Sequence, residues 1–327
     1  MTEIVLEAMA ASARAGAAYR DNVIPDLAAW RRDGERCALV TLVGVDGNAP
    51  RAAGAQMAVS ESGRFAGYIS GGCLEQAIAL EAAEAIEAGK PRLLRYGKGS
   101  PYFDIRLPCG SGLDVFIQPM HDIALIEEMA GRLLRRRPFA LRIELATGEA
   151  LLEEAGERQP LSHRDGASFV RAYGPALRCL VIGSSPIALA LSALAACAGF
   201  ETHFYSPGPE KAPALPGAVS LHPLAPRTAF AADAWTAAAL AFHDHDQELP
   251  VFAALLRSPC FFIGAIGSRN AHAARKLALA GLDFSEAEIA RIASPTGLVA
   301  GLKTAPFIAV SVLAQIVEAA REKRLIS

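Results

Sequence analysis

The sequence predicts an α/β protein in which an N-terminal mixed α+β domain is followed by a domain with a doubly wound parallel sheet. Three observations support this fold class. The chain has 327 residues, 52% of them hydrophobic, which is more than one hydrophobic core usually organises, so two domains are expected. Its first third combines a hairpin pattern with one long helical run. From residue 177 onward, apolar runs alternate with helical runs, as in a parallel sheet covered by helices.

The first domain is expected over residues 1–120 and opens with helical spacing up to about residue 34. Short apolar runs bounded by turn residues then predict strands at 37–43, 56–59, 65–69, 93–96 and 113–117. The run 73–88 is rich in helix formers. It stops before Gly89, with Pro91 just beyond, which is the expected carboxyl end of a helix.

Residues 121–175 are expected to connect the two domains. Their pattern predicts a helix to residue 137, a strand near 141–145, polar turns through 163–166 and a strand near 169–173.

The second domain is expected over residues 176–327. The apolar run 177–182, the turn Gly183–Ser184–Ser185 and an alanine-rich helix ending at Gly199 form the strand-turn-helix entry of a Rossmann-like domain. Further strands are expected at 201–205, 236–242 and 261–265.

The composition argues against several classes of partner. The net charge is -2 at pH 7, and basic residues form only short runs such as Arg135–Arg136–Arg137, so no nucleic acid is expected as a partner. No segment reaches about 18 uninterrupted apolar residues, and the amino terminus lacks the pattern of a signal peptide. We therefore expect no membrane association and a cytoplasmic location. The 6 cysteines include no C-x-x-C pair, which argues against a disulfide scaffold or a zinc ribbon.

Two cysteines stand apart because glycine turns flank them. Cys73 follows Gly71–Gly72, and Cys109 precedes Gly110–Ser111–Gly112. Their candidate roles are redox chemistry, nucleophilic catalysis and binding of a soft metal. The other four cysteines lie in apolar strand or helix patterns and are expected in or near the core.

Cys73 lies near the amino end of the predicted helix, where unpaired N–H groups and the helix dipole lower the pKa of a thiol. The same N–H groups, left open by Gly71 and Gly72, could hold a phosphate or another oxyanion. The alternative is a tight glycine turn with an unreactive thiol. For Cys109 the alternative is a simple turn before a strand.

Arg51 lies in a loop of turn-forming residues, 47–54. Its guanidinium could clamp a phosphate or a carboxylate through two hydrogen bonds. A loop arginine exposed to solvent is the alternative.

Three polar segments follow predicted strands of the second domain: Gly183–Ser184–Ser185, His243–Asp244–His245–Asp246 and Gly267–Ser268–Arg269. Open α/β sheets bind ligands at the carboxyl ends of their strands, so we expect these segments at one ligand-binding edge. The histidine–aspartate segment has the composition of a metal site, yet adjacent residues in regular structure cannot all converge on one ion. It could instead cap a helix that runs to Leu256. Arg269 near a helix amino end favours an anion.

The order of these motifs resembles the XdhC/CoxI family of molybdenum-cofactor maturation proteins. The first half contains GNAPRAAGAQMAV at 47–59, a hairpin, GYISGGCLEQAI at 67–78 and the second cysteine motif before an apolar strand. The second half contains LVIGSSPIALALSALAACAGF, AFHDHDQELPVFAALL, FFIGAIGSRNAHAARK and the ending ASPTGLVAGLKTAPFIAVSVLAQIVEAAR. The similarity covers nearly the whole chain. One departure is Pro108–Cys109–Gly110–Ser111, where family members often have Gly-Cys-Gly-Gly.

The resemblance implies a chaperone that binds the molybdenum cofactor (molybdopterin) and need not turn over a substrate itself. It would protect the cofactor while a terminal oxo ligand is exchanged for sulfido, and deliver it to a xanthine-dehydrogenase-type apoenzyme. It implies that Cys73 contacts the molybdenum, with Cys109 as a second thiol and Gly71, Gly72 and Arg51 near the anionic cofactor. A cysteine desulfurase is the further partner implied. We also expect a homodimer, with the apolar run 307–317 as either a core helix or a dimer face.

Two alternatives stay open. The strand–helix rhythm and Gly183 suggest an NAD(P)-dependent oxidoreductase. However, Ser185 and Ala188 replace two glycines of the dinucleotide-binding turn, and Tyr205–Ser206–Pro207 stands where an acidic residue would hold the ribose. These departures argue against tight NAD(P) binding. A nucleotide transferase acting on the pterin ranks below it, because no P-loop or Mg²⁺-carboxylate pattern is visible.

Overall fold

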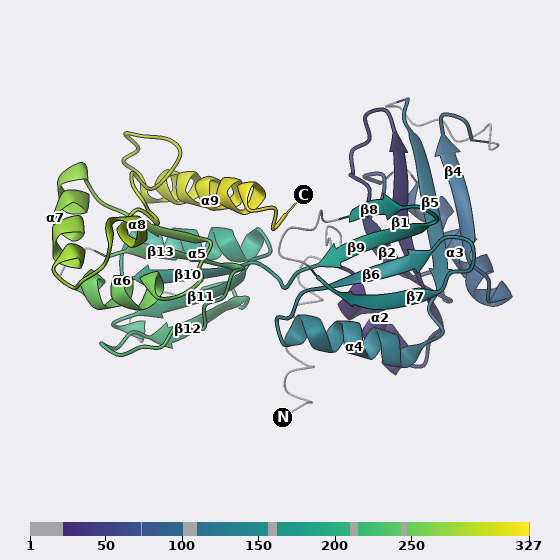
Figure 1. Ribbon diagram of the computed structural model, residues 1–327, viewed down its shortest axis with the longest axis horizontal. Coiled ribbons are helices and arrows are strands. Elements are labelled where there is room, and N and C mark those ends of the chain that lie inside the picture. The colour runs from purple at the N-terminus through teal and green to yellow at the C-terminus, as the bar shows by residue number, and fades with distance from the viewer. Residues whose placement is uncertain are drawn as a thin grey trace. The chain divides into compact units, whose positions relative to one another are not determined.

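The computed structural model describes residues 22–72, 74–100, 110–155, 162–209, 215–242 and 247–326. The chain divides into two compact units, Met1–Pro175 and Ala176–Ser327 (Figure 1). Antiparallel sheets build the first unit and a parallel sheet builds the second. This arrangement confirms the predicted α/β class.

The larger sheet of the first unit has the strand order β3-β2-β1-β5-β4, and all its neighbouring strands are antiparallel. Its strands are β1 (Cys37–Asp46), β2 (Gln56–Ser60), β3 (Phe65–Gly67), β4 (Arg92–Gly97) and β5 (Gly112–Pro119). The β2–β3 hairpin and the other three strands confirm the predictions from apolar runs.

Helix α3 (Glu75–Ala88) covers one face of this sheet. Its buried side chains, Ile78 and Ile86 among them, share a core with Val40 of β1. The helix ends at Gly89, which adopts a left-handed φ of 65°, as the sequence predicts.

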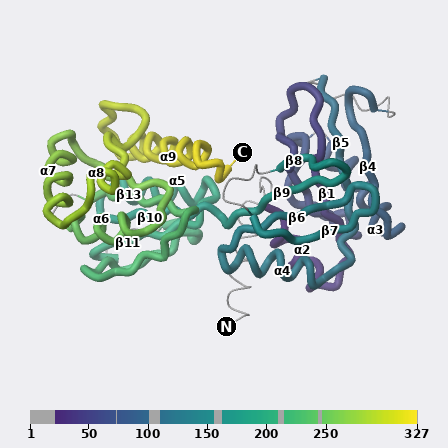
Figure 2. Tube along the Cα trace, in the orientation of Figure 1, coloured from purple at the N-terminus to yellow at the C-terminus, as the bar shows by residue number. Residues whose placement is uncertain are grey.

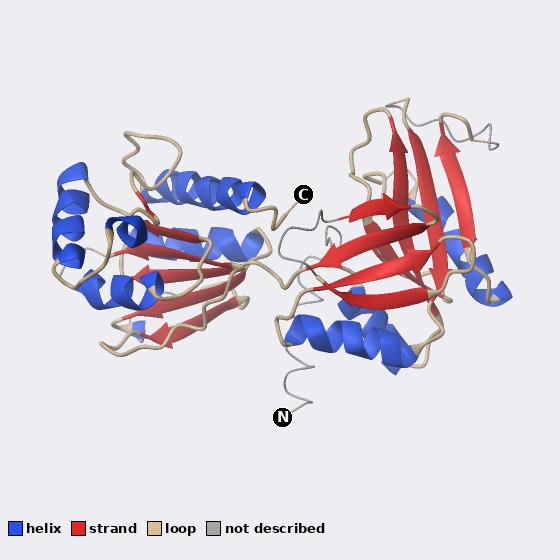
Figure 3. Ribbon diagram, viewed as in Figure 1, coloured by secondary structure: helices blue, strands red, loops and turns tan. Residues whose placement is uncertain are grey.

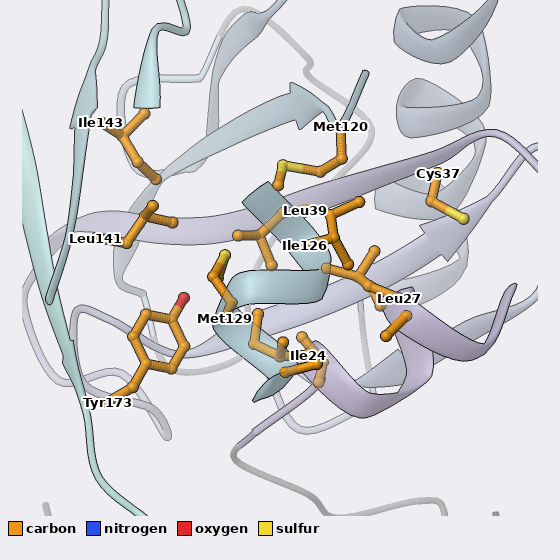
Figure 4. Close-up of a cluster of buried hydrophobic side chains, with 14 of the residues drawn as sticks. Ile24, Leu27, Cys37, Leu39, Met120, Ile126, Met129, Leu141, Ile143 and Tyr173 are labelled. Atoms are coloured by element: carbon orange, nitrogen blue, oxygen red, sulfur yellow. The ribbon is translucent and has the colours of Figure 1, made fainter. Parts of the chain in front are cut away.

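The opposite face packs against helices α2 (Ile24–Arg32) and α4 (Ile123–Leu134) and against a second sheet. Four antiparallel strands, in the order β7-β6-β9-β8, form that sheet: β6 (Phe139–Glu144), β7 (Ala150–Glu154), β8 (Ser162–Asp165) and β9 (Ser168–Tyr173). Figure 4 shows the shared core, where Leu39 of β1, Met129 of α4 and Leu141 of β6 lie together. Residues 121–175, which the sequence suggests as a connector, therefore pack into the first unit.

The prediction of polar turns through 163–166 is wrong, because Ser162–Asp165 form strand β8. Strand β7 is absent from the prediction as well. Both are edge strands of the second sheet and carry many polar or exposed side chains. Such strands lack the strong apolar alternation that identifies a strand in a sequence.

The sheet of the second unit contains six parallel strands in the order β12-β11-β10-β13-β14-β15. They are β10 (Arg178–Gly183), β11 (Glu201–Ser206), β12 (Val219–Pro223), β13 (Thr236–Ala241), β14 (Phe262–Ala265) and β15 (Ile292–Ala293). The order reverses between β10 and β13, which is the topological switch point of a Rossmann-like sheet. The tube in Figure 2 follows the chain from β10 through the next helix to β11.

Helices cover both faces of this sheet, as the helices in Figure 3 show. Helices α5 (Pro186–Cys197) and α9 (Ala305–Glu322) share one core with the strands. Helices α6 (Glu248–Leu256), α7 (Arg269–Ala280) and α8 (Glu286–Ile289) share the core on the other face. The doubly wound arrangement is therefore confirmed.

Three of the four cysteines expected in the core, Cys37, Cys179 and Cys260, are buried. Burial raises the pKa of Cys37 to about 11 and that of Cys179 to about 12, so both remain protonated thiols. The prediction is wrong for Cys197, which is exposed at the last residue of α5. The alanine-rich pattern of this helix does not reveal which of its faces meets solvent.

Within the described residues, no helix has both the length and the apolar composition needed to cross a membrane.

The shared core of the first unit predicts the effect of a substitution in β6. Leu141 is fully buried there, so Leu141→Ala should lower the free energy of unfolding by about 2–5 kcal/mol. Trp30 packs against the same core, so its fluorescence during urea denaturation, in a Trp235→Phe background, should report the loss. Leu151→Ala on β7 is the matched control, because Leu151 is 62% exposed. An unchanged Trp30 transition for Leu141→Ala would show that residues 121–175 fold apart from the helices and larger sheet.

Candidate functional site

Three loops of the first unit leave the larger sheet at the same end. The antiparallel register pairs Asp46 and Gly97 with Gly112, and it pairs Met57 with Gly67. The connections β1–β2, β3–α3 and β4–β5 therefore all lie at the same end of the strands, which we call the loop end. The sequence motifs around Arg51, Cys73 and Cys109 lie on these three connections.

Close approaches between the loops support this arrangement. A Cβ atom at Gly71 would lie 3.9 Å from the Pro50 side chain, and a Cβ atom at Gly47 would lie 3.6 Å from the Cα atom of Ser111. The β1–β2 loop therefore contacts both neighbouring connections. Motifs far apart in the sequence meet here because the sheet is antiparallel.

Arg51 is half-buried and interacts with Tyr68, which precedes the glycine turn. Its Nη1 atom donates a hydrogen bond of 3.2 Å to the Tyr68 hydroxyl, and its guanidinium carbon lies 4.4 Å from the centre of the Tyr68 ring. This contact holds the positive charge against the β3–α3 loop. Tyr68 was not among the residues expected at the site, since a tyrosine in a hairpin strand is also typical of a core.

The carboxylate of Glu75, the first residue of α3, accepts several hydrogen bonds from the backbone N–H groups of the glycine turn. It is 5% exposed. Its two oxygens accept hydrogen bonds from the backbone N–H groups of Ile69 (2.9 Å), Ser70 (2.7 Å), Gly72 (2.9 Å) and Leu74 (3.2 Å), and from the Ser70 hydroxyl. Burial opposes the charge, but these hydrogen bonds outweigh it and hold the pKa of Glu75 below its ordinary value.

The anion on the Gly72 N–H group is therefore the chain's own carboxylate. The expectation of an open N–H group is wrong for Gly72, because the Glu75 side chain, three residues along the chain, accepts its hydrogen bond. Gly71 and Gly72 have φ values of 85° and 112°, so their need for glycine is explained by the turn itself. The sequence signal that could have revealed this role is the acidic residue in the first turn of the helix.

Cys73 and Cys109 lie outside the described residues, and so do His243 and Asp244. For Cys73 the described neighbours Gly72 and Leu74 both donate their N–H groups to Glu75. Cys109 precedes Gly110, close to the start of β5 at the loop end. The metal contacts expected of the two thiols stay predictions.

The second unit brings two predicted segments to the carboxyl edge of its sheet. The register pairs Gly183 of β10 with Ala241 of β13, and Leu240 of β13 with Ala265 of β14, so the segments that begin at Gly183 and Gly267 lie at the same end of the sheet, with β13 between their strands. Gly183 has a φ of 142°, and a Cβ atom there would lie 2.3 Å from the carbonyl oxygen of Ala241. Only glycine allows this approach at the switch point.

The serines of these two segments have different environments. Ser185 is buried and Ser268 is exposed, and each caps a helix: the Ser185 hydroxyl accepts from the N–H group of Ala188 at 3.3 Å, and the Ser268 hydroxyl accepts from Ala271 at 3.2 Å. Ser184 and Arg269 are exposed at the same edge. Ser185 thus serves the scaffold, while the exposed residues face solvent where a ligand would approach.

A buried ion pair behind this edge escapes prediction. Arg275 of α7 donates to both carboxylate oxygens of Glu248, at 2.6 and 2.9 Å, and to the carbonyl oxygen of Ile266 at 2.7 Å. A Cβ atom at Gly267 would lie 2.9 Å from the Arg275 guanidinium. The pair fixes the turn after β14, yet in the sequence both residues look like ordinary surface charges on helices.

Among the residues that the structure describes, no group of three or more His, Cys, Asp or Glu side chains is placed to hold a metal ion.

Comparisons with known proteins cover most of the chain. A sequence model of the XdhC and CoxI family matches residues 30–97, and one of the XdhC Rossmann domain matches residues 179–316. The molybdenum cofactor insertion chaperone PaoD of Escherichia coli K12 is 35% identical over 286 residues, which are 86% of this chain and 83% of that protein. A Bacillus subtilis 168 protein, named as a probable xanthine dehydrogenase subunit, is 26% identical over 329 residues, 89% of this chain and 96% of that one.

The fold also has a solved relative. A crystal structure described as a xanthine dehydrogenase from Bacillus halodurans superposes with a TM-score of 0.74, covering 91% of this chain and 96% of that chain. Sequence identity between the two is 20%, so this likeness shows the fold alone.

The Glu75 arrangement predicts a stability loss with a specific pH dependence. Glu75→Gln replaces one acceptor oxygen by an NH₂ group facing N–H donors, so the free energy of unfolding at pH 7 should fall by about 3 kcal/mol. The pKa of the folded state is lowered, so the carboxylate stabilises the fold above the ordinary glutamate pKa and loses this effect as the pH falls through the folded value. The difference between wild type and Glu75→Gln should therefore shrink below about pH 4.

Urea denaturation at pH 7 and pH 3 measures both effects. Glu87→Gln, at an exposed position of the same helix, is the matched control and should change little. A Glu75→Gln loss that stays equally large at pH 3 would contradict the role of the charge.

Proposed function

Because the chain belongs to the XdhC and CoxI family, we propose that it is a molybdenum-cofactor chaperone for a xanthine-dehydrogenase-type apoenzyme. The observation that carries this proposal is the 35% identity, over 86% of the chain, with a protein named as a molybdenum cofactor insertion chaperone. In this proposal the chain holds the cofactor as cargo, protects it during sulfuration and transfers it. It acts in the cytoplasm with a cysteine desulfurase and need not turn over a substrate itself.

The chemistry of the loop end fits such cargo. Molybdenum in this cofactor is a soft centre that accepts thiolate ligands, and the pterin carries a phosphate. We assign the metal contact to Cys73, with Cys109 as the second thiol. Both lie on connections that reach the loop end.

The phosphate is assigned to Arg51. Its guanidinium is half-buried and lies beside Tyr68 at the entrance to the glycine turn. The N–H group of Gly72 already binds Glu75, so Gly71 and Gly72 contribute through the shape of the turn. Glu75 supplies the fixed backbone on both sides of Cys73.

For the second unit we propose cofactor contacts at the carboxyl edge of its own sheet. The exposed Ser184 and the segment Gly267–Ser268–Arg269 would supply them, with Gly183 and Ser185 shaping the turn. His243 and Asp244 follow the neighbouring strand and belong to the same assignment. Two features still argue against NAD(P) binding. The Ser185 hydroxyl caps helix α5, and β11 ends at Tyr205–Ser206 without the acidic residue that would hold a ribose.

The proposal predicts which thiol retains the cargo. When the chain is coexpressed with the cofactor pathway, Cys73→Ala should lose most of the copurifying molybdopterin, measured by fluorescence of the oxidised pterin. Cys197→Ala is the matched control, because Cys197 is an exposed thiol on α5 of the second unit. Pterin content that is unchanged in Cys73→Ala would exclude the proposed ligand, and a wild type without pterin would exclude cofactor carriage.

The homodimer stays part of the proposal and is supported by helix α9. Phe307, Val310 and Val317 are 66%, 51% and 39% exposed and, with Ala314, follow a spacing of three and four residues along one face. In an antiparallel pair of α9 helices, Phe307 would face Val317 and Val310 would face Ala314. Large side chains would thus meet smaller ones across the two-fold axis.

Light scattering after gel filtration tests this pairing. Wild type should have twice the mass of the chain, and Phe307→Asp should convert it to the monomer because a carboxylate in the seam lacks a partner. Leu277→Asp, at a residue of α7 that is 78% exposed, should leave the dimer intact. A monomeric wild type, or a dimeric Phe307→Asp, would contradict this interface.

A further inference from the structure

The loop that carries Arg51 connects β1 to β2, and its second half, residues 52–55, is hydrogen-bonded to β1. The N–H group of Gly54 donates to the carbonyl oxygen of Leu42 at 2.7 Å, and the N–H group of Leu42 donates to Ala55 at 2.9 Å. The N–H group of Ala55 also donates to Ala52 at 3.1 Å, which closes a tight turn. Residues 52–55 therefore have a defined backbone next to β1.

The second sheet contacts this same half of the loop. Arg171 of β9 donates from Nε to the carbonyl oxygen of Gly54 at 2.6 Å, and the hydroxyl of Ser162 of β8 donates to the carbonyl oxygen of Ala53. Gly54 has a φ of 97°, and a Cβ atom there would lie 2.5 Å from the Ser162 hydroxyl. Two side chains from the second sheet thus hold two successive carbonyl groups, and glycine is needed for the fit.

Arg171 is itself held in place. Its guanidinium carbon lies 4.3 Å from the centre of the Tyr173 ring, and its Nη1 atom donates to the carbonyl oxygen of Ala172 at 3.3 Å. The buried Tyr173 hydroxyl donates to Gln56 at 2.8 Å, and the Gln56 amide donates to Thr41 at 3.0 Å. A polar chain therefore runs from the second sheet through the shared core to β1, with Tyr173 labelled in Figure 4.

The first half of this connection, which includes Arg51, lies at the loop end of the larger sheet. Arg51 is three residues before Gly54, and its guanidinium stacks on Tyr68 of the β3–α3 connection. The position of this charge depends on where the backbone at 52–54 is held. A fixed backbone removes conformations that a ligand would otherwise have to restrict on binding.

We propose that Arg171, together with Ser162, is a positioning residue that holds Arg51 at the loop end for the phosphate of the cargo. This inference rests on the proposed function, because it takes Arg51 as the phosphate contact. It gives residues 121–175 a role in binding: the second sheet supports the loop that presents the charge. In this proposal Arg171 of β9 contacts Gly54 in the second half of the loop and does not contact the cargo.

The test compares Arg171→Gln with Arg142→Gln in the full chain. Arg142 is an arginine on β6 of the same sheet, whose ion pairs go to Glu153 and Asp165 within that sheet, so it controls for general damage there. Arg171→Gln should retain about tenfold less copurifying pterin than wild type, whereas Arg142→Gln should retain the wild-type amount. Equal retention by wild type and Arg171→Gln would overturn the proposal.

A double-mutant cycle separates positioning from simple destabilisation. If Arg171 acts through Arg51, then Arg171→Gln should cause little further loss in an Arg51→Gln background. Losses that multiply in the double variant would show that Arg171 acts independently of Arg51, which overturns the proposal. If Arg171→Gln does not fold, Ser162→Ala, which removes the hydroxyl on Ala53, takes its place in the same cycle.

Amide hydrogen exchange tests the positioning step without cargo. Residues 48–55 should exchange faster in Arg171→Gln than in wild type, with no change in Arg142→Gln. Should wild type carry no pterin, the proposed function fails, but this measurement still decides the inference about the loop. If exchange at residues 48–55 is the same in Arg171→Gln as in wild type, Arg171 does not hold this loop in place.

Discussion

The binding of the Glu75 carboxylate to the backbone of its own glycine turn is the interaction on which the loop end depends. Four N–H groups between Ile69 and Leu74 point at one buried charge. Such a turn without an anion would leave several buried donors without partners, at a cost of about 1–3 kcal/mol each. With Glu75 in place, the chain on both sides of Cys73 has a defined path, and α3 begins with an acidic residue at its positive end.

This internal anion changes how the glycine-rich motif is understood. Open N–H groups would attract the phosphate of a ligand, but here the charge requirement of the turn is met within the protein. The positive group that contacts the β3–α3 connection is the Arg51 guanidinium, beside Tyr68, whereas Arg95 and Lys98 at the same end form ion pairs with Asp46. A cofactor with both a phosphate and a soft metal would then divide its contacts between Arg51 and the two thiols.

Both units use a buried ionic or polar contact to shape a loop. In the second unit the Arg275–Glu248 pair lies behind Gly267 and also holds the carbonyl oxygen of Ile266, so the turn at the sheet edge has a fixed support. In the first unit Arg171 does the same for Gly54. Removing one member of the Arg275–Glu248 pair would leave the other charge buried without its partner. A substitution at either residue should therefore disturb the turn after β14.

The sequence by itself determined the elements with strong local signals. Apolar runs and glycine stops located β1, α3 and β10, and the ordered motifs indicated the family. Edge strands β7 and β8, the carboxylate of Glu75 on the Gly72 N–H group and the Arg275–Glu248 pair were decided by the tertiary structure. The physical reason is that periodicity reports which face of an element is apolar, whereas hydrogen bonds between loops and distant strands depend on register and topology. The antiparallel register brings Arg51 to the glycine turn, and no local pattern contains that information.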